Sequence, residues 1–322
     1  MTENVKSAAY NNLLDQNNKV FGSNDGQFVD ADQQILNFAR DDVHKNISTQ
    51  RPTRLYGPLA SYVKSIAQIS CGSIRGTCWL VSKRLVITNF HIYMMINKER
   101  EDTQNPNLPI YVSFDFLHHD PTQGVVTVEV DEEQDPDLEN LQLDYKFLCL
   151  KEDESLNGRP LLGSIVRGRR LEEGRVIIIG HPGGEEMHEE TCVVVSNHSW
   201  REKLNARHGA HTGVHMTNTD LLNATEGYKE CLPYDTSLFC GASGSPGSPD
   251  MNGNIVAMHA QGYVLPTMKG RRCSLMEFGL QFNAICKDIK RKYSENAVEE
   301  LFPNYNLDTD GQTMYDHPME VD

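Results

Sequence analysis

The middle of the chain is a series of short apolar runs, each interrupted by turn-forming or charged residues. The runs are rich in Val, Ile, Thr and aromatic residues, a composition typical of β-strands. They read SIAQIS, GTCWLV, RLVITNFHI, LPIYVSFDFL, GVVTVEV, YKFLCL, RVIIIGH, ETCVVVS, NIVAMHA and LMEFGLQF. No long helical period is evident between them. The pattern therefore disfavours a parallel α/β sheet and favours an all-β barrel or sandwich.

One helix is predicted after the last strand, where Phe282, Ile285 and Ile289 recur at helical spacing. The flanking segments are polar. Residues 1–54 are rich in Asn, Asp, Gln and Ser, and we expect a flexible extension there with one short helix around 30–43. The tail over 304–322 is acidic, and we expect it to be disordered.

The charge and cysteine content narrow the class of partner. The 322 residues carry a net charge of -15, which disfavours direct nucleic-acid binding by this chain. No apolar run has the length of a signal peptide or a bilayer span, so we expect no membrane association. The eight cysteines contain no CxxC pair and no zinc-ligand grouping. We expect reduced thiols, mostly in the core, and no metal.

The segment FCGASGSPG, residues 239–247, is the first candidate for chemistry. Glycines on either side of Ser243 predict a tight turn that presents its hydroxyl. The N–H groups of Gly241 and Ser243 can then face one point as an oxyanion hole. Ser245 is a competing nucleophile, but it has no glycine two residues before it. Cys240 is a further alternative.

A serine nucleophile needs a general base and a group that orients the base. Among the 12 histidines, His91 directly follows the strand-like run RLVITNF and its Thr-Asn pair. Asp144 opens the apolar run in LQLDYKFLCL, where a buried carboxylate needs a partner such as an imidazole N–H. The order His91, Asp144, Ser243 is that of the chymotrypsin triad. His259 is an alternative base, although it follows the serine by only 16 residues.

With these residues the sequence resembles the chymotrypsin-fold serine proteases. RGTCWLV and RLVITNFHI resemble their histidine-bearing strand pair, LDYKFLCL resembles the strand after their aspartate, and GASGSP is similar to their Gly-Asp-Ser-Gly-Gly-Pro. The resemblance implies an all-β fold of two antiparallel β-barrels with a C-terminal helix. It places a protease domain over 55–303, with barrels over about 55–160 and 161–280. It also implies protein substrates and no cofactor.

A narrower resemblance, over about residues 56 to 300, is to the intracellular trypsin-like proteases called family with sequence similarity 111. It rests on GHPGG with ETCVVV (180–195), on YDTSLFCGASGSPG (234–247) and on NIVAMHAQGY (254–263). This resemblance implies a nuclear, chromatin-associated protease that acts in replication past protein obstacles and in restriction of viruses. It also implies self-cleavage. The resemblance leaves open whether part of the protein is also in the cytoplasm.

Two positions depart from the secreted enzymes. Ala242 stands where their aspartate pairs with a newly cut N-terminus, so we expect no activation by N-terminal insertion. Dimerisation or substrate binding would then have to order the oxyanion hole, and a homodimer is one open route. Ile92 stands where they carry a cysteine after the histidine, in keeping with a reduced compartment.

The resemblance also places a specificity pocket. Ser237, six residues before Ser243, falls at its base and leaves it neutral. We therefore expect cleavage after Phe, Tyr or Leu. Asp235 lies two residues too early for the base and is expected to be a loop or capping residue. The backbone of Met258, His259, Ala260 and Gln261 is expected to pair with the substrate as an added strand.

Two other functions stay open. A protease fold that has lost its activity would serve as a binding or scaffold protein. A chaperone-protease of the Deg/HtrA group would normally add a peptide-binding PDZ domain, and few residues follow the barrels here.

Overall fold

The computed structural model describes residues 56–120, 124–235, 242–249, 253–266 and 272–305. The expected N-terminal extension and the acidic tail beyond residue 305 lie outside these ranges. Within them, no helix is both long enough and apolar enough to cross a membrane.

The first half of the protein is a seven-stranded antiparallel sheet with the strand order β5-β4-β1-β2-β3-β7-β6. A short helix, α3 (Tyr56–Tyr62), precedes it. The strands are β1 (Ile66–Cys71), β2 (Ile74–Ser82), β3 (Leu85–Thr88), β4 (Tyr111–Phe114), β5 (Val126–Glu129), β6 (Glu139–Asn140) and β7 (Tyr145–Cys149).

Hydrogen bonds just beyond β5 and β7 curl this sheet into a barrel. The Asp131 N–H donates to the carbonyl of Cys149 at 2.7 Å, and the Lys151 N–H donates to that of Glu129 at 2.9 Å. Val130 and Leu150 form an antiparallel bridge between these two bonds. The paired edges leave less of the sheet open to another chain.

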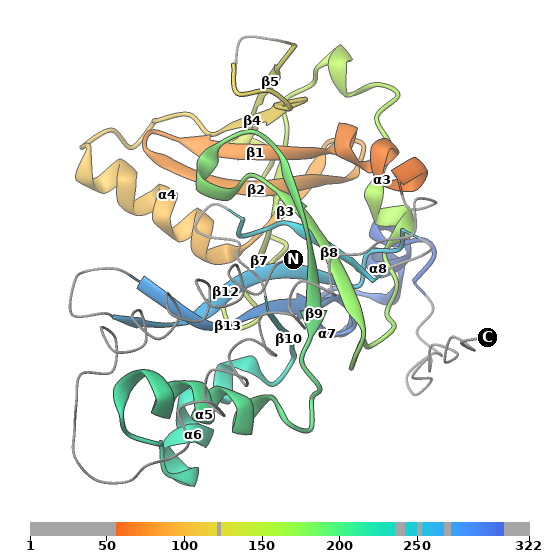
Figure 1. The fold of residues 1–322 in the computed structure, drawn as a ribbon. Coiled ribbons are helices and arrows are strands. Elements are labelled where there is room, and N and C mark those ends of the chain that lie inside the picture. The colour runs from red at the N-terminus through yellow and green to blue at the C-terminus, as the bar shows by residue number, and fades with distance from the viewer. Residues whose placement is uncertain (1–55, 121–123, 236–241, 250–252, 267–271, 306–322) are drawn as a thin grey trace, which may run out of the picture. The chain divides into compact units, whose positions relative to one another are not determined.

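The second half is a closed six-stranded barrel with the order β10-β13-β12-β11-β8-β9 (Figure 1). Its strands are β8 (Arg175–Gly180), β9 (His188–Val194), β10 (Cys231–Asp235), β11 (Pro246–Pro249), β12 (Ala257–Pro266) and β13 (Arg272–Gln281). Two barrels in sequence confirm the all-β prediction, and every strand predicted from composition is present in part.

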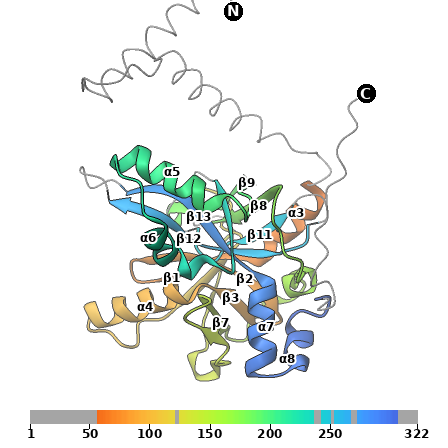
Figure 2. The same ribbon diagram turned by 90° about the horizontal axis from the view of Figure 1, so that it is seen from below.

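The helix after the last strand is also confirmed. α7 (Phe282–Lys292) buries Phe282, Ile285 and Ile289, and its last turn is basic, which suits the negative end of the helix dipole. A second helix, α8 (Glu295–Leu301), begins where the Ser294 hydroxyl accepts the Ala297 N–H at 3.1 Å. Figure 2 shows the two helices next to each other.

The expectation that no helices interrupt the strands is wrong. α4 (Phe90–Asp102) follows β3, and both α5 (Trp200–Thr212) and α6 (Asn218–Ala224) lie between β9 and β10. Their apolar positions are few: α4 buries only Ile92 and Ile96. Such helices give weak periodicity, because most of their surface faces water.

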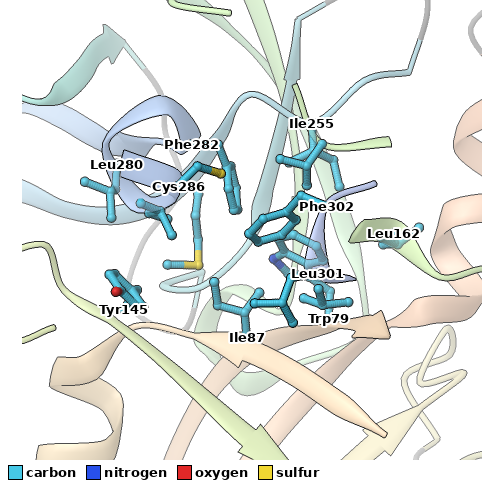
Figure 3. Packing of buried hydrophobic residues seen from close by; sticks show 14 of the residues in the cluster. Trp79, Ile87, Tyr145, Leu162, Ile255, Leu280, Phe282, Cys286, Leu301 and Phe302 are labelled. Atoms are coloured by element: carbon cyan, nitrogen blue, oxygen red, sulfur yellow. The ribbon is translucent and has the colours of Figure 1, made fainter. Parts of the chain in front are cut away.

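The largest core cluster joins the two barrels. It contains Trp79 and Ile87 of the first barrel, Leu280 of the second, and Phe282 and Phe302 of the C-terminal helical region. Figure 3 shows these side chains converging. The Trp79 and Phe282 rings meet edge to face with 5.6 Å between centroids, as do Phe282 and Phe302. Each barrel also has its own apolar interior.

The cysteines in the described part are free thiols. Five are buried, in keeping with the predicted core role: Cys71, Cys78, Cys149, Cys192 and Cys286. The side chains of Cys240 and Cys273 lie outside the described residues.

Candidate active site

His91 is the second residue of α4, three residues after β3 ends at Thr88. The predicted strand is therefore shorter than expected, because Asn89 adopts an extended conformation as N-cap and the chain then turns into the helix. The imidazole is 33% exposed, so it is open to solvent and to a ligand.

Asp144 lies directly before β7, which pairs with β3 in a register that sets Lys146 opposite Thr88. Its carboxylate makes two bonds to one residue. Oδ1 accepts the His91 backbone N–H at 2.8 Å, and Oδ2 lies 2.8 Å from Nδ1 of the imidazole. Because a carboxylate is an acceptor, Nδ1 carries the proton. Nε2 is then the acceptor nitrogen, the tautomer that a general base requires.

Asn89 fixes the backbone of Asp144 by a hydrogen bond. It is fully buried, and its Nδ2 donates to the backbone carbonyl of Asp144 at 3.0 Å. Asp144 has a positive φ of 51°, which is uncommon for a residue with a side chain. The Asn89 bond stabilises this turn. The sequence analysis noted the Thr-Asn pair before His91 but gave Asn89 no role.

The loop of Ser243 is fixed to both barrels. The Ser243 carbonyl accepts the backbone N–H of Thr77 in β2 at 2.8 Å, and the Gly244 N–H donates to the carbonyl of His259 in β12 at 2.9 Å. Gly244 has φ 91°, and a methyl group there would stand 1.9 Å from the Thr77 carbonyl oxygen. Only glycine fits at this position.

Thr77 also connects this loop to the histidine strand. The hydroxyl of Thr88, three residues before His91, donates to the Thr77 carbonyl at 2.8 Å. The Thr77 hydroxyl accepts the His181 backbone N–H at 3.0 Å. Thr77 is fully buried, so β2 connects the histidine strand and the serine loop through hydrogen bonds of the Thr77 backbone that are shielded from solvent.

The Ser243 hydroxyl donates to the backbone carbonyl of Ala260 at 3.0 Å. A hydroxyl has a single hydrogen, so in this conformation the proton of Ser243 points to β12 and not to His91. Transfer of that proton to Nε2 of His91 requires the hydroxyl to turn away from Ala260.

The alternative residues lie in unsuitable environments. Ser245 is fully buried, and a side chain on Gly180 would collide with its hydroxyl. His259 is 4% exposed, and burial lowers its pKa to about 4, with a smaller contribution from the charge of His91. Its Nδ1 lies 2.5 Å from the Tyr234 hydroxyl. His259 is therefore a neutral core histidine, near enough to His91 to respond to its charge.

The open part of the β12 edge begins at Ala260. Met258 pairs with Pro246 on one side and with Leu280 on the other. The His259 N–H donates to the Ser245 carbonyl at 2.8 Å. Of the four residues predicted to pair with a substrate, Met258 and His259 are already engaged. Ala260 carries the Ser243 contact, and Gln261 is exposed.

Asp235 is not a loop residue. It ends β10 and forms ion pairs with Lys203 at 2.9 Å and with Arg207 at 2.5 Å. Burial raises the pKa of its carboxyl, but the hydrogen bonds and charges of these two partners outweigh burial and lower the pKa overall. Ala242 is buried. Ser237, Cys240 and Gly241 fall outside the described residues, so the pocket base and one oxyanion donor are not placed.

Metal-ligating atoms come together once among the residues that the structure describes. Glu185, Glu186 and His188, at the start of β9, have such atoms within 4.8 Å of one another. They lie at or near the surface, where acidic groups commonly meet without an ion. The His91–Asp144 pair and Ser243 use none of them.

Two β-barrels with a histidine–aspartate pair on the first and a glycine-flanked serine on the second define the class. The chain belongs to the trypsin-like peptidase domain family, whose profile matches residues 76–258. It is 32% identical over 171 residues to the mouse (Mus musculus) protein described as "Serine protease FAM111A". That match covers 49% of this chain and 27% of the relative, and so confirms the narrower resemblance for this part of the relative.

Solved structures include the Rv3671c protease in an inactive form, with a TM-score of 0.44 and 13% identity over 76% of this chain and 96% of that one. A serine-to-alanine mutant of the same protein from M. tuberculosis H37Rv, also inactive, has a TM-score of 0.45 and 14% identity with the same coverage.

Proposed function

We propose that this chain is a serine endopeptidase in which Ser243 is the nucleophile, His91 the general base and Asp144 the group that orients His91. The observation that carries the proposal is that His91 donates two 2.8 Å hydrogen bonds to the Asp144 carboxylate, from its backbone N–H and from Nδ1, and the second leaves Nε2 as the acceptor. The family membership of residues 76–258 supports it independently.

The reaction follows from these groups. Ser243 turns from Ala260, and its oxygen attacks the carbonyl carbon of the substrate as its proton passes to Nε2 of His91. The C–N bond breaks as His91 returns that proton to the leaving amine, and an acyl ester remains on Ser243. A water molecule then gives a proton to His91 as its oxygen attacks the ester. His91 passes that proton to the Ser243 oxygen as the acyl C–O bond breaks and the acid is released. The Asp144 carboxylate stabilises the transient imidazolium. The N–H groups of Ser243 and Gly241 are proposed to bind the oxyanion.

The finer points of function are also proposals. With Ser237 at the base of a neutral pocket, we expect cleavage after Phe, Tyr or Leu, with an extended substrate pairing at the edge that begins at Ala260. A nuclear, chromatin-linked role and self-cleavage, which the resemblance of the sequence implies, are proposed for this chain as well. A homodimer is proposed as the means of ordering the oxyanion hole.

One observation favours a second candidate, a binding protein without activity. The Ser243 hydroxyl is bonded to Ala260 and not to His91, which is the geometry of a resting or silent site. If this conformation persisted with substrate bound, the fold would bind an extended peptide without cutting it.

A paired assay separates the two candidates. Wild type and Ser243→Ala are incubated, over a range of protein concentrations, with an unfolded protein and with fluorogenic peptides that place Phe or Lys before the scissile bond. We expect turnover of the Phe peptide by wild type and loss of about three or more orders of magnitude in the variant. Equal, negligible turnover by both proteins would favour the binding protein.

A further inference from the structure

Glu277 is a buried acid in the second barrel that the proposed reaction does not use. It lies in β13 and is 7% exposed. Burial of a carboxylate without a counter-charge is costly, so such a position calls for a reason. Among the described residues, the charge that acts on its carboxyl is that of Glu190 in β9, and the groups that respond to it include Tyr234 in β10 and Tyr228.

The register places Glu277 behind the edge of β12 that we propose for the substrate. Glu277 stands opposite Gly262 in β12 and opposite Tyr234 in β10. The Ala260 carbonyl accepts the hydrogen bond from the Ser243 hydroxyl, and Gly262 lies two residues after Ala260. The register of β12 shifts at Ala260, because His259 pairs with Gly279 and Gln261 with Phe278, so regular alternation of side chains does not apply there. Two residues of a strand span about 7 Å at most, which keeps Gly262 close to the nucleophile contact.

Gly262 leaves the space that Glu277 fills. A methyl group on Gly262 would stand 2.4 Å from Oε1 of Glu277 and 2.4 Å from the Ser274 hydroxyl oxygen. The carboxyl therefore occupies the volume that a side chain at 262 would take. A group that enters beside Gly262 meets this carboxyl in place of an apolar wall.

We propose that Glu277 determines which substrate side chain is accepted beside Gly262, before the scissile bond, admitting aromatic side chains when it is neutral and Lys or Arg side chains when it is ionised. An entering Lys or Arg side chain would supply a counter-charge to the ionised carboxylate, which has Glu190 as its charged neighbour among the described residues. A neutral carboxylic acid leaves the site uncharged and compatible with an apolar ring. The inference rests on the proposed function and refines its expected preference for Phe, Tyr and Leu.

The balance between these two states falls near neutrality. Burial raises the pKa of Glu277 to about 7, with Glu190 adding to the rise and a hydrogen bond from Ser274 opposing it. Below this value the acid is neutral, and above it the acid is ionised. Cleavage after Lys should therefore gain on cleavage after Phe as the pH rises.

The test is the ratio of kcat/KM for two peptides that differ only in Lys or Phe before the scissile bond. His91 serves both peptides, so its contribution to the rate cancels in the ratio. Between about pH 6 and about pH 8 the ionised fraction of a group with a pKa near 7 rises about tenfold and its neutral fraction falls about tenfold. We therefore expect the ratio to rise by up to about a hundredfold. In Glu277→Gln the ratio should be low and independent of pH.

Two further measurements keep the test decisive. Glu190→Gln removes the neighbouring charge at a residue outside the proposed machinery, so the midpoint of the ratio should move to lower pH. Benzamidine, a cationic aromatic probe, should bind wild type about tenfold more tightly at the higher pH, and this calorimetric readout needs no turnover.

The outcomes separate the two proposals. A ratio that does not change with pH, in a protein with Ser243-dependent turnover, overturns the role of Glu277 and leaves the protease proposal intact. Absence of turnover overturns the protease proposal. Benzamidine affinity then decides on Glu277, and an affinity that is the same in wild type and in Glu277→Gln overturns its role.

Discussion

At the scale of single residues, the candidate site depends on hydrogen bonds to backbone groups, which hold the segments of His91, Asp144 and Ser243 in place. Asn89 and Thr77 supply much of this fixation, and neither has a chemical role of its own. The sequence analysis found His91, Asp144 and Ser243 because their local contexts are distinctive. It did not assign Asn89 or Thr77, because a buried amide or hydroxyl acquires its partner only when β2, β3 and β7 have assembled.

The first prediction concerns Asn89. In Asn89→Ala the Asp144 carbonyl loses its 3.0 Å donor, and the turn with positive φ is free to relax. A small displacement of an orienting group can cost about a hundredfold in rate, so we expect kcat for the Phe peptide to fall about ten- to a hundredfold. KM should stay nearly unchanged, because Asn89 is fully buried and not available to the substrate.

The control for this prediction is a measurement that the Asn89→Ala variant is folded under the assay conditions. The lost bond should lower the free energy of unfolding by about 1–3 kcal/mol, which far-UV circular dichroism during urea unfolding would measure. A folded variant with unchanged kcat would show that Asn89 does not position Asp144.

At the scale of elements, α7 is joined to the first barrel through Asp288. Its Oδ2 accepts from Asn140 at 2.8 Å and from the Tyr145 hydroxyl at 2.7 Å, and its Oδ1 accepts from Arg291 at 2.6 Å. Lys292 lies 3.1 Å away as an ion-pair partner. Burial raises the pKa of this carboxyl, but these donors outweigh burial and lower its pKa to about 2.

The second prediction follows from that shift. A carboxyl with a lowered folded-state pKa contributes stability above its usual pKa and loses it as the pH falls through the folded value. Asp288 should contribute about 2 kcal/mol at neutral pH, and this contribution should disappear between about pH 4 and about pH 2. Urea unfolding of wild type and Asp288→Asn as a function of pH measures the difference.

The variant should be less stable at neutral pH, and the gap should close in acid. A gap of the same size at every pH would mean that packing, and not the ionised carboxylate, accounts for the effect.

The elements also show what composition predicts and what it misses. The strands were predictable, because runs such as RVIIIGH are apolar on both faces and short, as buried strands are. The helices α4 and α5 were not, because α4 buries only two of its thirteen residues as apolar side chains. The sequence analysis extended the strand to residue 92, beyond its end at Thr88, for the same reason: the helix that follows, α4, has little apolar periodicity.

At the scale of the whole molecule, the two barrels share one core. Phe302, 1% exposed, packs between Phe282, with centroids 5.6 Å apart, and Phe147 of the first barrel, at 6.3 Å. Trp79 of the first barrel and Leu280 of the second belong to the same cluster. A shared core of this kind should make the barrels unfold together, which keeps His91 and Ser243 in one cooperative unit.

The third prediction tests this coupling. Phe302→Ala should lower the free energy of unfolding by about 3–5 kcal/mol, because it removes a ring from a well-packed interior. Tryptophan fluorescence and far-UV circular dichroism should report a single coincident urea transition in both proteins, with a lower midpoint in the variant. Two separated transitions in wild type would mean that the barrels are independent.

The central claim is that Ser243 is a nucleophile activated by His91. The most direct measurement is covalent labelling of the folded protein by a fluorophosphonate, with the modified residue located by mass spectrometry after digestion. We predict a label on Ser243, no label in Ser243→Ala, strongly slowed labelling in His91→Ala, and unimpaired labelling in Ser245→Ala, whose hydroxyl is fully buried. A label on Ser245, or a folded wild-type protein that takes up no label with or without substrate peptide, would contradict the claim.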